Sequence, residues 1–246
     1  SGILTLQKFE KKKFQALINQ LSNSKKILTS TILEQYIQEK DFPIISKVDG
    51  AIQLSGKLAN VSFYKESTNI MMLVKSNKEK KVVIIPSNSF KILETKTSLI
   101  GEEICNLEIS NFNIEEKNFV GTNENFNNII DFMYYNTIIA KCSESIGVAE
   151  HILNITLDYV KNREQFNNKI GSFQAVQHNL SDMYISINET RELIRYAAKE
   201  KYSEEFKKLA LFCKIICDEK ISKITWTAHQ LHGAIGFTWD YGLHLL

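Results

Sequence analysis

The 246-residue sequence has no apolar run long enough to span a membrane, and it has no signal peptide. Its four cysteines, Cys105, Cys142, Cys213 and Cys217, are too few and too scattered for a disulfide framework. Excess charge is also missing, because the formal net charge is +2 at pH 7, and nothing indicates a nucleic-acid surface. We therefore expect a soluble protein of a reducing compartment, which we place in the cytoplasm.

Two of the cysteines raise the question of a metal. Cys213 and Cys217 are four residues apart on a helical pattern, and only His178 or the pair His229 and His232 could join them as ligands. Cysteines on an apolar helix face are the simpler interpretation. We therefore expect two buried helix cysteines and assign no metal.

The N-terminal part has a helical pattern over residues 3–40. Its apolar residues recur at three-to-four spacing between Lys-rich faces, at Leu6, Phe9, Phe14, Leu17, Ile18 and Leu21. Lys40-Asp41-Phe42-Pro43 breaks the pattern. We assign residues 1–46 to a partial N-terminal helical segment. Ser1-Gly2 is typical of a tag remnant and Leu246 ends an apolar run, so we expect native ends further out.

Strand patterns replace the helical pattern from Val48. Apolar residues alternate from there, with Gly50 and Gly56 expected as turns. Further strand-like segments lie at 70–74, 82–86, 104–109 and 119–121. We expect residues 47–122 to form an antiparallel β domain.

Three long amphipathic helical patterns fill residues 123–246. The first has one apolar face formed by Ile146, Ala149, Leu153, Thr156 and Val160. The second runs from Phe173 to Ile194, and the third from Phe206 to Ile224. Consecutive helices with short connections indicate an antiparallel bundle. The expected fold class is α+β: a short helical segment, a central antiparallel β domain and a C-terminal helical bundle.

Two segments at helix ends carry residues suited to a dinucleotide. Arg163-Glu164-Gln165-Phe166 combines guanidinium donors, which fit a pyrophosphate, with a flat aromatic face. The segment 230–237, Gln-Leu-His-Gly-Ala-Ile-Gly-Phe, has two glycines within four residues, where backbone can approach a ligand.

These segments resemble those of the acyl-CoA dehydrogenases. The resemblance runs in order through residues 143–243, including Gly147-Val148-Ala149, 159–166, 170–178 and 230–241, and is coarser over 49–121. It implies FAD-dependent α,β-dehydrogenation of an acyl-CoA thioester in fatty acid metabolism, with a Glu base and an electron-transferring flavoprotein as acceptor. Members of the family are usually dimers or tetramers built on the C-terminal bundle.

The resemblance also implies which residues hold the cofactor. In the family, these segments of one subunit hold the ADP half of the FAD seated in its neighbour. The implied residues are Arg163 and Gln165 at the pyrophosphate, Phe166, Ile170 and Gln174 by the adenosine, and Gln230 and Gly233 behind the pyrophosphate.

The sequence departs from the family where the flavin ring would sit. Residues 37–46, in place of a glycine-rich loop, contain no glycine, so close backbone approach to a ring is not expected. Residues 57–63 replace a Trp-Ile-Thr-Asn-Gly signature and leave Ser62 as the remaining donor. Ala234 replaces a second glycine, which is tolerable unless the backbone there needs a positive φ.

The catalytic base is also missing from its family positions. One position would lie beyond Leu246, and the alternative falls at Thr137. Glu144, seven residues later on the same helix face, is a weak candidate, and a surface or ion-paired Glu144 is favoured over it.

Three functional hypotheses remain open. We favour a subunit of a heteromer that supports a neighbour's FAD, because adenosine-side motifs are kept while internal flavin-side residues 56–63 are not. The alternatives are a self-sufficient homo-oligomeric dehydrogenase with truncated ends and a non-catalytic scaffold of the same fold.

Overall fold

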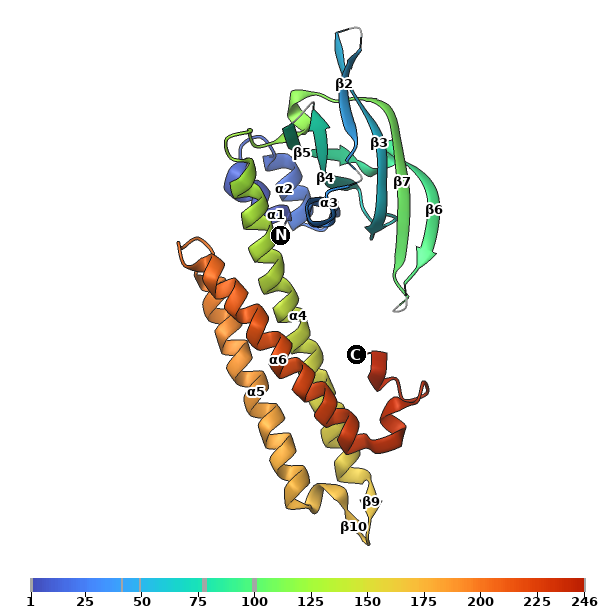
Figure 1. The fold of residues 1–246 in the computed structure, drawn as a ribbon, viewed down its shortest axis with the longest axis vertical. Coiled ribbons are helices and arrows are strands. Elements are labelled where there is room, and N and C mark those ends of the chain that lie inside the picture. The colour runs from blue at the N-terminus through green and yellow to red at the C-terminus, as the bar shows by residue number, and fades with distance from the viewer. Residues whose placement is uncertain (1, 41, 49, 77–78, 99–100, 246) are drawn as a thin grey trace. The chain divides into compact units, whose positions relative to one another are not determined.

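The computed structural model describes residues 2–40, 42–48, 50–76, 79–98 and 101–245, in two compact units, Ser1–Tyr134 and Tyr135–Leu246 (Figure 1). The predicted α+β class is confirmed, with N-terminal helices, a central sheet and a C-terminal bundle. Asp41, in the predicted break of the helical pattern, and Asp49, in the predicted alternating segment, lie outside the described residues. The predicted domain limits at 46/47 and 122/123 stay predictions.

The first unit is built on a mostly antiparallel sheet. Its strands are β1 (Leu28–Ser30), β2 (Ile44–Val48), β3 (Ala51–Ser62), β4 (Asn69–Ser76), β5 (Glu79–Pro86), β6 (Lys91–Thr97), β7 (Glu103–Asn113) and β8 (Phe119–Val120). The main path runs β6-β7-β3-β2-β4-β5-β8. Strand β4 pairs in parallel with β1 and with the start of β2, while its pairing with β5 is antiparallel.

Strand β4 is buried on both faces, which explains its uninterrupted apolar sequence. Met71 and Leu73 join a core with helices α1 (Gly2–Phe9), α2 (Gln15–Ser22) and α3 (Ile32–Gln38). Ile70, Met72 and Val74 join a second core with β3, β5 and β7. The apolar run therefore marks the centre of this unit.

Two local expectations were wrong, and one strand was not expected. Residues 28–30 form a strand within the range expected to be helical, because they pair with 69–71. Gly56 is not a turn but lies inside β3, at a shift in the register between β3 and β7. Strand β6 was not expected, because every residue in it is exposed and it shows no apolar alternation.

The second unit is the predicted antiparallel bundle (Figure 1). Helix α4 (Phe126–Asn162) supplies one side, and α5 (Gln174–Lys199) and α6 (Phe206–His232) complete it. The predicted face of α4 is buried at all five positions, Ile146, Ala149, Leu153, Thr156 and Val160. Two short 3₁₀ helices follow, Gly233–Phe237 (η4) and Leu243–Leu245 (η5).

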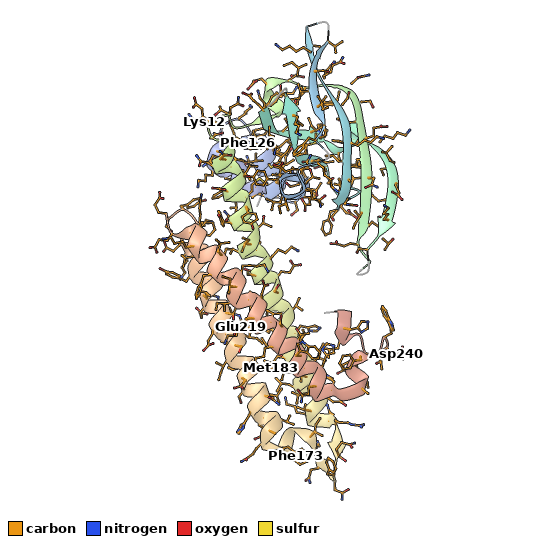
Figure 2. The ribbon with its side chains drawn as sticks, in the orientation of Figure 1. Lys12, Phe126, Phe173, Met183, Glu219 and Asp240 are labelled. Atoms are coloured by element: carbon orange, nitrogen blue, oxygen red, sulfur yellow. The ribbon has the colours of Figure 1, made fainter. Side chains whose placement is uncertain are left out.

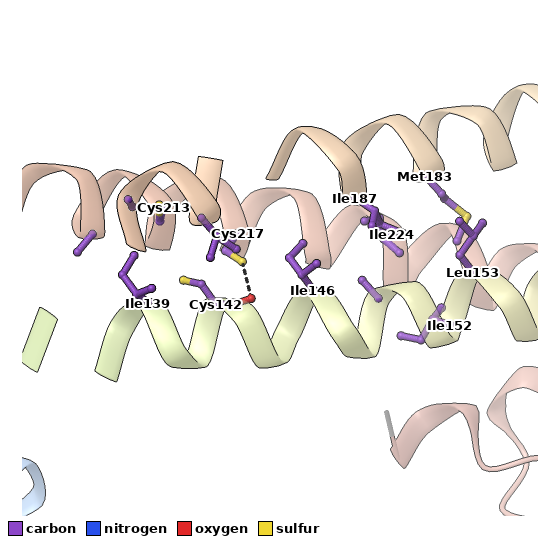
Figure 3. Close-up of a cluster of buried hydrophobic side chains, with 14 of the residues drawn as sticks. Ile139, Cys142, Ile146, Ile152, Leu153, Met183, Ile187, Cys213, Cys217 and Ile224 are labelled. Carbon is purple, nitrogen blue, oxygen red and sulfur yellow. Dashed lines mark hydrogen bonds between the residues drawn. The ribbon is translucent and has the colours of Figure 1, made fainter. Parts of the chain in front are cut away.

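The bundle core contains three of the four cysteines (Figure 3). Cys213 and Cys217 are buried, as predicted, and the Cys217 thiol donates to the Cys142 carbonyl at 3.7 Å. Among the described residues, no group of three His, Cys, Asp or Glu side chains is placed to hold a metal. In the same part of the chain, no helix is long and apolar enough to cross a membrane.

Candidate functional site

The segment after helix α4 is a tight hairpin. Strands β9 (Glu164–Gln165) and β10 (Asn168–Lys169) pair across a turn formed by Phe166 and Asn167. Both turn residues have positive φ, 54° and 59°, as a type I′ turn requires. Asn tolerates this conformation, whereas a bulky residue such as Phe rarely adopts it. The turn nevertheless holds Phe166 with 87% of its surface exposed.

Arg163 stands between the helix and the hairpin. Its N–H donates to the Tyr159 carbonyl and its carbonyl accepts from Ile170 N–H, both at 2.9 Å. The backbone is thus fixed on both sides, while the side chain is exposed. Within the described residues the guanidinium makes no ion pair, and it borders a hollow of about 500 Å³ together with Ile155, Asp158, Tyr159, Asn162 and Tyr241. The Arg163 side chain, on a fixed backbone, therefore remains available to an anion.

The other predicted residues of this segment lie around the hairpin and the start of α5. Gln165 is exposed and donates to the Glu164 carbonyl at 2.7 Å. Ile170 is half-buried, and Gln174 is exposed at the first position of α5. Phe173, directly before α5, lies at the hairpin end of the bundle (Figure 2). Gly171 allows this packing, because a Cβ there would stand 3.0 Å from the Val160 carbonyl oxygen.

The second segment begins where helix α6 ends. Gly233 has φ 66° and ψ −145°, a backbone conformation that strongly favours glycine, although a Cβ there would meet nothing within 4 Å. Ala234 follows in a 3₁₀ helix and is absent from the positive-φ residues, so its methyl group causes no backbone strain. Gln230 and Gly233 are both exposed.

A cluster of one buried and two partly buried rings connects the two segments. The Tyr159 ring stacks on His232, with centroids 4.5 Å apart and 26° between the planes. The Tyr159 hydroxyl also donates to the His232 carbonyl at 3.3 Å. His232 in turn shares a 2.9 Å hydrogen bond with the Tyr241 hydroxyl. Sequence reasoning noted these three residues as part of the motifs but gave them no role, since only the fold brings positions 159, 232 and 241 together.

The candidate base, Glu144, lies on the surface. Its carboxylate forms a 2.7 Å ion pair with Lys141, and 62% of its side chain is exposed. The hydroxyl of Thr137, at the alternative base position, is buried and lacks a hydrogen-bond partner within the described residues. A threonine hydroxyl is no base at neutral pH, so neither residue presents a carboxylate in a desolvated site.

On the flavin side, Gly56 and the backbone of Ser62 make contacts within the first unit. Gly56 provides room for Pro43, since a Cβ at Gly56 would stand 2.6 Å from the Pro43 Cα. The Ser62 carbonyl accepts from the Thr29 hydroxyl at 2.9 Å within the sheet. The glycine in this region therefore serves protein packing, unlike the open backbone at Gly233.

The fit to FAD thus differs between the two halves of the dinucleotide. Arg163, Phe166 and Gly233 offer free donors, an exposed ring and open backbone, which suit an ADP moiety. On the other side, residues 37–40, 42–46 and 57–63 contain no glycine, and Gly56 between them is filled by Pro43, so the described backbone there lacks the open glycine seen at Gly233.

Comparisons with known proteins agree with the fold. Residues 136–246 match the family model described as acyl-CoA dehydrogenase, C-terminal domain. Acyl-CoA dehydrogenase IpdE2 of Mycobacterium tuberculosis is 35% identical over 107 residues, which are 44% of this chain and 32% of that protein. The match therefore spans about a third of that relative's length.

Solved structures extend the similarity to the whole chain. Butyryl-CoA dehydrogenase from Megasphaera elsdenii aligns with a TM-score of 0.84 at 20% identity, over 99% of this chain and 67% of that chain. The ChsE4–ChsE5 complex from Mycobacterium tuberculosis aligns with a TM-score of 0.79 at 19% identity, over 99% and 66%. At these identities the likeness concerns the fold.

Proposed function

We propose that the chain is a subunit supporting FAD-dependent α,β-dehydrogenation of an acyl-CoA thioester. The proposal is supported by the match of residues 136–246 to the acyl-CoA dehydrogenase C-terminal domain and by the similarity to IpdE2. In this proposal the chain works within a heteromer of same-family subunits and offers the ADP-holding half of an FAD site to its neighbour. An electron-transferring flavoprotein reoxidises the flavin.

One observation carries the proposal: the hairpin holds an exposed Phe166 in a strained turn and follows Arg163, which is exposed and makes no ion pair with the described residues. A non-glycine residue in the left-handed region costs about 1–2 kcal/mol. An exposed phenyl ring contributes nothing to the core in return. The strained and exposed position of Phe166 is explained if its ring and the Arg163 guanidinium contact a ligand. An adenosine diphosphate offers an aromatic face to the ring and two phosphates to the guanidinium.

The flavin side supports a division of labour between chains. FAD, when bound, accepts the hydride that leaves the acyl group. The residues of this chain that fit it are those of the adenosine half, while Gly56 is filled by Pro43. The alignment with the two-subunit ChsE4–ChsE5 complex shows that this fold occurs in heteromers, which supports the same arrangement for this chain.

The catalytic carboxylate is assigned to the neighbouring subunit. Proton abstraction from the α-carbon needs a base held near the substrate with its pKa adapted to the task. Glu144 is paired with Lys141 in solvent, and Thr137 carries no carboxylate. The acyl-CoA therefore binds, in this proposal, where the partner supplies both flavin ring and base.

The test is co-expression with a same-family subunit from the same genome. We expect the isolated chain to show little flavin absorbance and the complex to be yellow and reducible by an acyl-CoA. Arg163→Ala should weaken FAD retention about tenfold or more, because it removes charge-assisted hydrogen bonds. Lys161→Ala, an exposed cation two residues away on the helix, should retain FAD and serves as the control.

Two results would reject the heteromer. A fully loaded homo-oligomer that reduces its own FAD with an acyl-CoA would make the chain self-sufficient. If the chain binds no flavin with any same-family subunit, the remaining hypothesis is a non-catalytic scaffold of the same fold.

A further inference from the structure

His232 is almost completely buried at the end of helix α6, with 4% of its surface exposed. Its Nδ1 lies 2.7 Å from the Ala228 carbonyl, which can only accept, so Nδ1 carries the hydrogen. In a neutral ring Nε2 is then an acceptor, and the Tyr241 hydroxyl donates to it at 2.9 Å. These two hydrogen bonds thus select the Nδ1–H tautomer of the neutral ring.

The same residue contacts each part of the candidate site. Tyr159 stacks on its ring and donates to its carbonyl, and the Tyr159 carbonyl holds the backbone N–H of Arg163. Gly236 packs against it, because a Cβ at Gly236 would stand 3.0 Å from the His232 Cβ. Gly233, whose positive φ turns the backbone out of the helix, is its direct neighbour in sequence.

We propose that neutral His232 is a positioning residue, which fixes the exposed backbone at Gly233 relative to the Arg163 end of helix α4. This inference rests on the proposed function, since the two positions it aligns are those assigned to the FAD pyrophosphate. His232 reaches the phosphates through Gly233 and Arg163 and does not touch them itself.

The proposal requires the uncharged ring, and the surroundings favour it. Burial lowers the pKa of His232 and outweighs the hydrogen bond to the Ala228 carbonyl, which raises it, while His229 makes a smaller lowering contribution. The other titratable groups facing the cluster are Tyr159 and the solvent-exposed Asp158 on α4, and Tyr241 on the C-terminal segment. A second proton would make Nε2 a donor, force the Tyr241 hydrogen away and leave a buried cation. The alignment should therefore loosen in acid.

The test uses the flavin-loaded heteromer and the full chain. We expect His232→Gln to raise the dissociation constant for FAD at least fivefold at neutral pH. We also expect it to flatten the rise in FAD release that the unaltered complex shows on acidification. Tyr241→Phe should weaken FAD retention in the same direction by a smaller factor. His229→Gln is the matched control, because His229 has the same Nδ1 bond, to Thr225 at 2.9 Å, without a tyrosine partner for Nε2 in the described chain.

Nitrogen NMR of the imidazole rings gives a readout independent of flavin. We expect a neutral Nδ1–H form for His232 at neutral pH in the full chain. An Nε2–H form, or a loaded complex in which His232→Gln keeps both affinity and pH profile, would overturn the inference while leaving the proposed function intact. An unaltered complex without flavin would overturn the proposed function and this inference with it. If His232→Gln fails to fold, the NMR result and the Tyr241→Phe variant still test the inference.

Discussion

Pro43 fills the space that a side chain at Gly56 would need. A Cβ on Gly56 would stand 2.6 Å from the Pro43 Cα and 3.0 Å from its Cβ, and φ at Gly56 is 152°. The Pro43 backbone cannot move away from an added methyl group as the end of a flexible side chain could. The glycine is therefore required by the approach of the β2 entry to β3, and this contact has a measurable consequence.

Gly56→Ala should lower the free energy of unfolding by about 2–4 kcal/mol, from overpacking and backbone strain together. Gly50→Ala is the control, since Gly50 also has positive φ, 81°, but nothing lies within 4 Å of its Cβ. Its cost should stay near about 1 kcal/mol. Urea unfolding of both variants measures the difference, and equal losses would show that Pro43 yields to the methyl group.

Gln35 gives a second stability prediction, because its side chain completes the backbone hydrogen bonds of Leu73. Its Oε1 accepts from Leu73 N–H at 2.8 Å and its Nε2 donates to the Leu73 carbonyl at 3.0 Å. Gln35→Leu should cost about 2–5 kcal/mol, because it leaves a buried donor and acceptor unpaired. Gln38→Leu, exposed on the same helix, should change stability by less than about 0.5 kcal/mol. Thermal unfolding distinguishes the two.

The cysteines of the bundle should be unreactive in the folded chain. Burial raises the pKa of Cys213 to about 11, so little thiolate forms at pH 8. The hydrogen bond between Cys217 and Cys142 raises the pKa of Cys217 and lowers that of Cys142, so Cys142 is protected by its burial. We expect no fast reaction with a thiol reagent at pH 8 before unfolding, and four reactive thiols in denaturant. A fast native reaction would mean that the bundle opens locally.

Phe166 in the hairpin turn should lower the stability of the chain and favour FAD binding. Phe166→Gly should raise stability by up to about 1 kcal/mol, because glycine adopts the left-handed conformation without strain. The same change should release FAD from the proposed heteromer. Asn167→Gly, at the other positive-φ position, should leave FAD in place. Loss of flavin in both variants would attribute the effect to turn flexibility and not to the Phe166 ring.

The pH dependence of stability should carry a contribution from His232. Its pKa in the folded chain is lower than in the unfolded chain, where it is about 6.5, so the unfolded state binds more protons between the two values. Stability should therefore fall as pH drops below about 6.5 and level off below the folded pKa. In His232→Gln this slope should shrink, whereas His229→Gln, which removes only the smallest of the causes of the shift, should keep most of it. Denaturant midpoints at several pH values provide the measurement.

Periodicity predicted the parts of the fold in which a whole face is buried. The helix face from Ile146 to Val160 and the apolar run 70–74 follow directly from patterns of spacing and length. Strand β6 escaped this reasoning because none of its residues is buried. The strand at 28–30 escaped it because pairing with a distant segment, and no local pattern, determines its conformation.

The sequence likewise predicted only part of the candidate site. Arg163, Phe166 and Gly233 were identified from residue type and order, and those assignments stay predictions. The strain at Phe166 needs backbone angles, and the role of Gly56 needs the position of Pro43. His232 is a similar case, because a histidine near a helix end could face solvent or core, and only its contacts with Tyr159 and Tyr241 distinguish these environments.

Strand β6 should influence whether the protein aggregates in concentrated solution. It is the terminal strand of the sheet, and a terminal strand with free backbone groups invites another chain to add to it. Here Lys91, Glu94 and Lys96 place charges along that edge, and the register with β7 shifts between Ile92 and Glu94. Ile92 and Leu93 are exposed on the same strand, so we expect the charges and the irregular edge to counter the tendency of this strand to pair with another chain.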